Sequence, residues 1–412
     1  MKTALSLAAL AVTTASLAIA APAAAKPGDP IKVNDDLTID PIIEGNLRWE
    51  HVDQDDLGRD ADAVTMRLRA GAEATTHGLS LLAEAEGTLA IGDHYNDTIP
   101  GNNGYLGAEP YSVVADPQNV ELNRLQMAYQ GKSAKVTIGR QRVILDNARF
   151  VGNVGWRQNE QTFDAIRGQA KVGPVALDVT YSISQRTIFG VDSPNQHFDG
   201  NMILANGSFD VKPLKITGFA YMIDYDTRVA FSSQTFGFLA SGAVPLGGGA
   251  KVNFKASYAN QQDYKLNPVH YSADYINAEL GASLAGFGIK AGYEELGSDG
   301  GVAAFQTPLA TLHAFNGWAD LFLTTPANGL RDYYAGASAK IGNAGPLKGM
   351  KAAVVYHKFK SDYASIDYGQ EWDASLGFAV AGYPVLLKYA NYDAKAFGTD
   401  TGKLWLQVSF KY

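Results

Sequence analysis

The chain has 412 residues, with 34 basic and 42 acidic side chains, 43 glycines and no cysteine. The absence of cysteine excludes a disulfide scaffold, a thiolate metal site and a thiol nucleophile. The net charge of −8 argues against a nucleic-acid partner, which would need a basic face. Charged residues make up 18% of the chain, below the roughly 25% of ordinary soluble domains. This composition favours a large β protein outside the cytoplasm.

The first 25 residues have the features of a secretory signal peptide. Lys2 supplies a positive start, an apolar run follows, and A-x-A cleavage frames end at Ala20 and at Ala25. The apolar run is shorter than the roughly 20 residues that a membrane span requires. We expect cleavage after Ala25, with Ala20 as the alternative. Residues 26–40 are then a short periplasmic segment, and residues 41–412 form one domain.

Most of the remaining chain alternates between apolar and polar residues, which is the pattern of β-strands. In 64–75, for example, Val64, Met66 and Leu68 alternate with polar side chains. Soluble strands usually have about five or six residues, whereas strands that span a bilayer need about 9–11. The predicted strands are longer than soluble ones, at 41–53, 63–75, 79–93, 119–130, 135–145, 163–172, 175–188, 198–209, 214–226, 233–245, 250–264, 272–285, 287–296, 332–342, 349–361, 367–381, 384–394 and 402–412.

The connections between these strands alternate between tight turns and long loops. The long ones include 94–118, 146–162, 189–197 and 297–331. Outer-membrane barrels have this arrangement, and a soluble β-sandwich has no reason to sort its loops in this way. We therefore predict an all-β fold: a transmembrane, antiparallel, up-and-down barrel of about 18 strands, of the Gram-negative outer-membrane type, with an aqueous interior. Sixteen strands remain an alternative if 233–245 or 287–296 is divided wrongly.

The last predicted strand ends on an aromatic residue. Leu404, Leu406, Val408 and Phe410 share one face with Tyr412. A strand of this kind resembles the C-terminal signal that the outer-membrane insertion machinery recognises, and ending on the aromatic Tyr412 is its more specific feature. An ordinary amphipathic strand at a chain end is the alternative. We expect contacts with lipid and lipopolysaccharide around the barrel.

Eleven of the thirteen arginines fall between Arg48 and Arg186. An arginine fork can bind a carboxylate bidentately, so an arginine wall suits an anionic solute. The alternative is a ladder of ion pairs that braces a wide barrel, because glutamates share the same faces. Both interpretations remain open. The alternation predicts that five arginine side chains point into the lumen, with three glutamates nearby: Arg48, Arg67, Arg69, Arg124 and Arg167, and Glu44, Glu84 and Glu86.

The strand at 135–145 is irregular, because Arg140 and Arg142 have the parity of the apolar Val136 and Ile138. Either a bulge at Gly139 reverses the alternation, or this end rises above the hydrocarbon. The segment that follows is rich in aromatic and hydrogen-bonding side chains, which predicts a loop folded into the barrel. The predicted constriction consists of Arg140, Arg142, Arg149, Trp156, Arg157, Gln158 and Gln161.

The stretch Gly139–Asp164 resembles the signature of the alginate-export family of outer-membrane porins, with support from Leu122–Tyr129. The resemblance implies a monomeric eighteen-stranded barrel whose electropositive, arginine-lined pore passes a polyuronate. It assigns pore roles to the arginines of Gly139–Asp164 and to Arg124 and Arg167. The chain departs from the pattern in its short loops, its negative net charge and its inward Glu84, Glu86 and Glu279. Alginate as the cargo does not follow.

No other motif indicates chemistry. The seven histidines form no H-x-x-x-H or H-x-H pair, and the chain has neither a G-x-S-x-G elbow nor a phosphate-binding loop. We predict no catalytic residue, metal or cofactor. The predicted function is passive passage of polar, anionic solutes, uronate-like or oligosaccharide, through a monomeric outer-membrane channel. A non-conducting structural or adhesive barrel is the alternative, and an interfacial lipid hydrolase is a weaker one.

Overall fold

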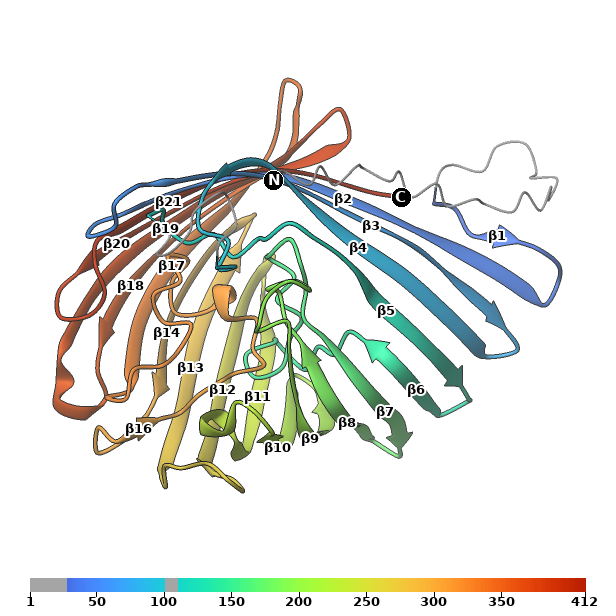
Figure 1. The fold of residues 1–412 in the computed structure, drawn as a ribbon, viewed down its shortest axis with the longest axis horizontal. Helices are drawn as coiled ribbons and strands as arrows, with labels where there is room; N and C mark the ends of the chain where they lie inside the picture. The colour runs from blue at the N-terminus through green and yellow to red at the C-terminus, as the bar shows by residue number, and fades with distance from the viewer. Residues whose placement is uncertain (1–27, 101–109) are drawn as a thin grey trace, which may run out of the picture.

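The structure is a computed structural model that describes residues 28–100 and 110–412, so the predicted signal peptide lies outside the described residues. Its main sheet has nineteen strands, all paired antiparallel. One of them, β1 (Ile31–Lys32), only adds to the edge of β2 (Leu37–Gln54). The remaining strands close into a barrel, because β2 also pairs with β21 (Thr401–Lys411). The predicted eighteen-stranded barrel is confirmed (Figure 1).

The strands follow the predicted segments closely. The largest differences are in β2, which starts at Leu37 instead of residue 41, and in β6, which ends at Gln141 instead of residue 145. Residues 233–247 and 287–296 each form one strand, which removes the sixteen-stranded alternative. Between β2 and β21, the barrel strands in chain order are β3 (Ala61–Thr76), β4 (Leu79–His94), β5 (Asn119–Gln130), β6 (Ala134–Gln141), β7 (Thr162–Val172), β8 (Val175–Arg186), β9 (His197–Val211), β10 (Leu214–Tyr225), β11 (Ser233–Gly247), β12 (Ala250–Asp263), β13 (Ser272–Leu284), β14 (Phe287–Leu296), β17 (Leu330–Ala344), β18 (Leu347–Lys360), β19 (Asp367–Val380) and β20 (Tyr383–Ala394).

The two faces of the barrel wall differ as alternation predicts. On β3, Met66 and Leu68 are 38% and 44% exposed, whereas Arg67 and Arg69 are 8% and 4% exposed. The apolar face is therefore outward and the charged face inward. Closure is what permits this arrangement in a bilayer, because each backbone N–H and C=O must be bonded within the protein. In the described residues no helix has the length and apolarity to cross a membrane.

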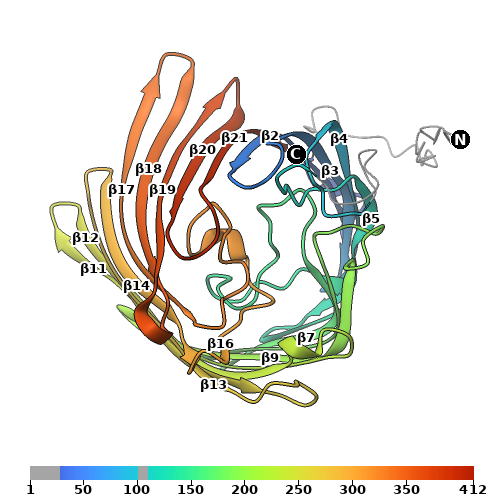
Figure 2. The same cartoon turned by 60° about the vertical axis from the view of Figure 1, so that its left-hand side comes forward.

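Two long connections fold into the barrel. They are the β6–β7 loop (residues 142–161) and the β14–β17 loop (residues 297–329), which carries β15 (Ser298–Asp299), β16 (Ala303–Ala304) and the short helix η3 (Leu312–Ala314). Figure 2 shows them as the teal and orange segments inside the ring. The backbones bond to each other: Gly152 N donates to Leu309 O at 2.8 Å, and Thr311 N donates to Ala148 O at 3.0 Å. Only the first loop was predicted to fold inward.

Part of the interior is packed rather than aqueous. Phe219 and Tyr275 project inward from the wall and lie 4.8 and 5.0 Å from the ring of Phe150 in the β6–β7 loop. Phe305 of the β14–β17 loop joins the same cluster, 5.5 Å from Tyr275. The predicted aqueous channel is therefore narrowed further than expected, because the loops and the wall form a packed aromatic cluster inside the barrel. Inward positions that the loops cover carry aromatic residues, because they contact protein instead of water.

The inward and outward faces can be tested with one substitution on each. Phe238 of β11 is 47% exposed and faces outward, and Leu239 beside it faces the lumen opposite the buried Thr217. We expect Phe238→Arg to lower the free energy of unfolding by about 2–4 kcal/mol, because a cation on the lipid face loses hydration. Leu239→Arg should cost much less. Urea unfolding in lipid vesicles would measure both, and equal losses would contradict the assigned faces.

Candidate functional site

Two of the cavities inside the barrel are bordered by the β6–β7 loop. The first, of about 410 Å³, lies beside the tight turn between β5 and β6 and is called here the turn-side cavity. The second, of about 300 Å³, is lined by the long connections and is called here the loop-side cavity. A solute crossing the barrel would meet both cavities and the loop between them, so these define the candidate site.

The arginines on the barrel wall are bound to carboxylates. Arg124 of β5 donates to both oxygens of Glu84, at 2.9 and 2.6 Å. Arg167 of β7 donates in the same bidentate way to Asp178 of β8, at 2.8 and 2.5 Å. Arg69 bonds Glu86. All three side chains face inward as expected, but each is part of the ion-pair ladder and not an open charged surface.

The arginines of the β6–β7 loop are paired as well. Arg149 donates to Glu294 of β14 at 2.8 Å and is 2% exposed. Arg157 donates to Asp320 at 2.9 Å and to Glu50 at 3.2 Å. These bonds attach the β6–β7 loop to the wall and to the β14–β17 loop.

Glu160 shows how strongly these pairs interact. Burial by itself would raise the pKa of the Glu160 carboxyl, but the guanidinium groups of Arg69 and Arg142 lower that pKa to about 2. Arg142 donates to Glu160 through two nitrogens, and Arg69 lies 3.6 Å away. Opposite charge within a few ångströms thus outweighs desolvation here.

Arg140 was predicted in the constriction, and the register of β6 contradicts this. Arg140 stands opposite Leu125 of β5, which is 45% exposed on the outer face. Residues directly opposite in an antiparallel pair share a face. Arg140 therefore points outward, where it bonds Asp164 at 2.8 Å. Gly139 has φ +114°, but it does not reverse the alternation.

The remaining predicted constriction residues are buried contacts of the β6–β7 loop. Gln158 is fully buried and donates to the Thr65 hydroxyl at 2.8 Å. Gln161 donates to Leu309 O at 2.9 Å. Arg48 donates to Asp116 at 3.3 Å and to Gln407 at 2.7 Å, and its Cζ lies 4.2 Å from the centre of the Trp156 ring. They hold the loop in place and leave little surface for a solute.

Arg67 is the exception among the predicted residues. It forms no ion pair with any described carboxylate, its Nε has no hydrogen-bond partner, and its Nη1 reaches only Arg157 O at 3.5 Å. It is 8% exposed and lies beside Arg69 on the inner face of β3. Of the predicted arginines of the wall and the inward loop, Arg67 is therefore the one whose charge is not neutralised by a direct partner.

A residue that sequence reasoning missed joins both loops to the wall. Lys388 Nζ of β20 lies 4.0 Å from the Trp156 ring centre, 3.8 Å from that of Trp318, and 2.6 Å from His313 Nε2. His313 Nδ1 is 2.8 Å from an Asp320 oxygen. A neutral imidazole fits both contacts, because it can accept from Lys388 and donate to Asp320. The signal in the sequence is a single charge among Leu386, Ala390 and Tyr392 on the inward parity of this strand.

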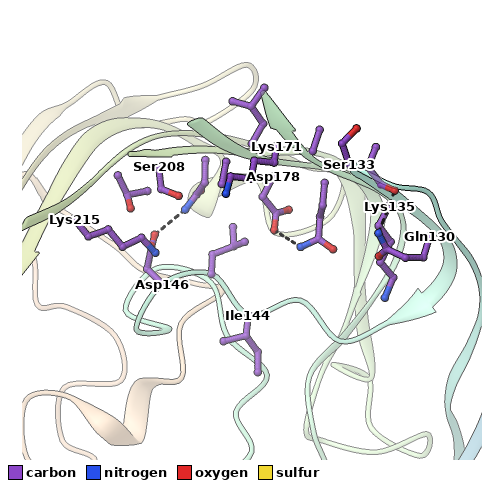
Figure 3. Close-up of a pocket in the computed structure, with 17 residues that line it drawn as sticks. Gln130, Ser133, Lys135, Ile144, Asp146, Lys171, Asp178, Ser208 and Lys215 are labelled. Carbon is purple, nitrogen blue, oxygen red and sulfur yellow. Dashed lines mark hydrogen bonds between the residues drawn. The ribbon is translucent and has the colours of Figure 1, made fainter. Parts of the chain in front are cut away.

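Free cations occur elsewhere in the lumen. Figure 3 shows Lys135, Lys171 and Lys215 around the turn-side cavity, from β6, β7 and β10. Within the described residues none of the three forms an ion pair: Asp178 is bound by Arg167, and Lys215 acts on Asp146 only through its charge, which opposes the effect of burial on the pKa of that carboxyl. Burial raises the pKa of Asp146, whose carboxylate accepts from Asn206 at 2.7 Å. The turn-side cavity is thus lined by ammonium groups that have no direct partner.

The chain is similar to known proteins both in sequence and in fold. A sequence model of the alginate export family matches residues 44–212, from β2 to β9. Three solved structures have the same fold. Pseudomonas aeruginosa OpdK with vanillate has a TM-score of 0.67 and 14% identity, and covers 90% of this chain and 98% of its own. Acinetobacter baumannii OccAB4 has a TM-score of 0.70 and 12% identity, and the match covers 94% of this chain and 100% of OccAB4. Pseudomonas aeruginosa OpdQ has a TM-score of 0.68 and 14% identity, and the match covers 91% of this chain and 97% of OpdQ.

The chain has the fold of the porin-type β-barrels of the outer membrane. The matched stretch includes Gly139–Asp164, so the resemblance seen in the sequence is confirmed. A comparison with curated proteins gave no match. The porin fold is consistent with a lipid and lipopolysaccharide environment and with a monomeric channel.

Replacing Arg157 tests how the inward loops of this porin are held. Arg157→Gln leaves the buried Glu50 and Asp320 without their shared guanidinium. Breaking a buried pair from one side costs about 3–5 kcal/mol. We expect faster hydrogen exchange in residues 150–160 with the barrel intact, measured by mass spectrometry. Arg331→Gln, which breaks the part-exposed pair with Glu295 on β14, is the control and should leave that exchange unchanged.

The docking of the β14–β17 loop should weaken in acid. Burial lowers the pKa of His313 to about 3, and nearby Lys388 and Arg157 add to the shift that Asp320 opposes. A depressed histidine pKa means that the unfolded state binds the proton more tightly. Stability is therefore lost as pH falls from about 6.5 towards 3, by up to about 1.4 kcal/mol per pH unit.

The measurement is hydrogen exchange in residues 305–320 at pH 7 and pH 4.5, corrected for intrinsic rates. We expect lower protection in acid, and no such change in His313→Asn. A protein whose protection in this segment is the same at both pH values would contradict a neutral, buried His313.

Proposed function

We propose that this barrel passes small polar anions, uronate-like or other carboxylate-bearing solutes, by passive diffusion. The observation that carries the proposal is the set of unpaired lysines around the turn-side cavity. Unpaired charge of one sign on a low-dielectric wall raises the local concentration of the opposite ion, and rings of charge are how pores select ions.

The arginines play a different part in this proposal. Each guanidinium in a bidentate pair is cancelled at short range by its carboxylate, so its field on a passing ion is small. We assign bracing roles to the paired Arg48, Arg69, Arg124, Arg142, Arg149, Arg157 and Arg167, and to Trp156 and Gln158. In this proposal the solute contacts Lys135, Lys171 and Lys215, and it also contacts Arg67 where the inward loop meets the wall.

Two comparisons agree with carboxylate-bearing solutes. The matching family is described by alginate export, and the OpdK structure is described with vanillate. Both named compounds carry carboxylates, although one is a polymer and the other a small ring. The identity of the cargo and the direction of transport are not fixed by either.

One observation favours a second candidate, a barrel that is closed at rest. The two inward loops bond to each other, and the Lys388 contacts fix them to the wall. In such a barrel, anions would pass only after the loops separate. Conductance of the wild-type protein distinguishes a resting channel from a closed barrel.

The lysines can be tested by the reversal potential across a planar bilayer under a salt gradient. In Lys135→Gln/Lys171→Gln/Lys215→Gln we expect the anion preference of the wild type to fall severalfold, with single-channel conductance retained. The matched control removes three exposed lysines that lie in or next to tight turns and do not line the turn-side cavity, Lys132→Gln/Lys212→Gln/Lys348→Gln. If control and lumen variants shift the potential equally, the lysines act only through net charge and the proposed filter is wrong.

A further inference from the structure

The loop-side cavity differs in character from the turn-side cavity. It has a volume of about 300 Å³, at the lower end of the range for small-molecule pockets, about 300–1,000 Å³. Its walls come from the connections β8–β9, β10–β11 and β14–β17 and from the β6–β7 loop. Much of the lining is apolar, from Ile188, Phe189, Phe198, Phe231, Leu312 and Leu323.

One charged group at this cavity has no partner. Arg228 lies between two rings, with its Cζ 3.9 Å from the centre of Phe231 and 4.8 Å from that of Phe198. Among the described residues it forms neither an ion pair nor a hydrogen bond, and burial lowers its pKa. A guanidinium stacked through its faces still has its N–H donors along its edges. Those donors are available to a ligand.

The other charged and strongly polar groups around the cavity are already engaged. Arg157 is bound by Glu50 and Asp320. Asp320 is also held by His313 and by Lys403, 3.3 Å away. Gln306 exchanges hydrogen bonds with the backbone of Thr325. Among the described residues that line this cavity, Arg228 is therefore the one cation without a partner, and the apolar side chains offer an incoming anion a surface for packing.

The segment that carries Arg228 is held rigidly. Phe231 N donates to Arg228 O at 2.9 Å, closing the turn of η2 (Val229–Phe231). Asn267, from the β12–β13 connection, donates to Ala230 O at 3.1 Å and to Ser232 O at 2.8 Å. A cation placed in advance costs less entropy when it binds its ligand.

We infer that the loop-side cavity is a binding site for a small monocarboxylate with an apolar body, such as a ring, whose carboxylate pairs with Arg228 and whose body packs among the phenylalanines and leucines. This inference rests on the proposed anion channel and specifies one class of solute for it. The site is distinct from the lysine-lined turn-side cavity. Its binding is an equilibrium property of the folded barrel, so it can be tested without conduction.

The test separates charge from apolar body with three probes. Benzoate has both, benzamide has the ring without the charge, and acetate has the charge without the ring. Isothermal titration of the refolded full-length mature protein in detergent, with empty micelles subtracted, should give saturable binding of benzoate. Benzamide and acetate should bind at least tenfold more weakly, because each lacks one of the two contacts.

Two variants locate the site. Arg228→Gln should weaken benzoate at least tenfold and leave benzamide unchanged, because only the charged contact is lost. Lys265→Gln removes an exposed loop cation that lies over Tyr264 and does not line the cavity, and it should leave benzoate binding unchanged. Phe231→Ala should weaken both ring-bearing probes. Folding of each variant is checked by heat-modifiable migration in SDS gels.

Three outcomes would overturn the inference: no saturable benzoate binding, equal binding of acetate and benzoate, or benzoate binding that survives Arg228→Gln. None of them bears on the reversal potential of the turn-side lysine variants. A barrel that selects anions but ignores benzoate would refute this site alone. A barrel that binds benzoate through Arg228 but shows no anion preference would refute the proposed function alone.

Discussion

The pairing of buried arginines with buried carboxylates is the interaction on which the interior of this barrel depends. Removing a guanidinium and a carboxylate from water is costly, and only close, well-oriented pairs offset that cost. Arg149 with Glu294 and Arg157 with Asp320 both connect an inward loop to distant parts of the chain. Without these pairs, folding the two loops into the lumen would leave buried charges on the wall without partners. The inward position of the loops would then be energetically unfavourable.

This constraint separates two kinds of cation in the lumen. Arginine binds carboxylates through a planar fork and holds loops in place, whereas lysine is a compact point charge that remains hydrated. The arginines of the β2–β7 wall and of the β6–β7 loop are largely neutralised. The lysines of the turn-side cavity are not. The electrostatic character of the pathway therefore follows from which cations lack partners, and a count of arginines on the inner face does not reveal it.

Much of the fold follows from the sequence, because a transmembrane barrel depends on period-two alternation and on the difference between its turns and loops. Alternation alone places Arg69 and Arg124 on the inner face, as the structure does. It misplaces Arg140 in the constriction, because an arginine that follows Val136 and Ile138 on the outer parity looks like a break in the pattern. The register with Leu125 shows that the pattern continues.

The partners of the site residues could not be predicted in the same way. Arg157 and Asp320 are 163 residues apart, and they meet only because two loops enter one barrel. The β14–β17 loop is poor in arginine, so it lacked the signal that identified the β6–β7 loop. Gly152 shows how close the two loops come, since a Cβ there would lie 2.2 Å from Thr311 Oγ1. Lys388 was missed because its partners, Trp156, Trp318 and His313, come from both loops.

The central claim is that the lumen arginines other than Arg67 and Arg228 are neutralised by carboxylates, whereas the turn-side lysines form no ion pair. Crystals of the protein soaked in sodium bromide, with anomalous data collected at the bromine edge, test this most directly. We expect bromide peaks beside Lys135, Lys171 or Lys215, and none at the Arg69, Arg124 or Arg157 ion pairs. Bromide at those arginine pairs, with the turn-side cavity empty of it, would contradict the account.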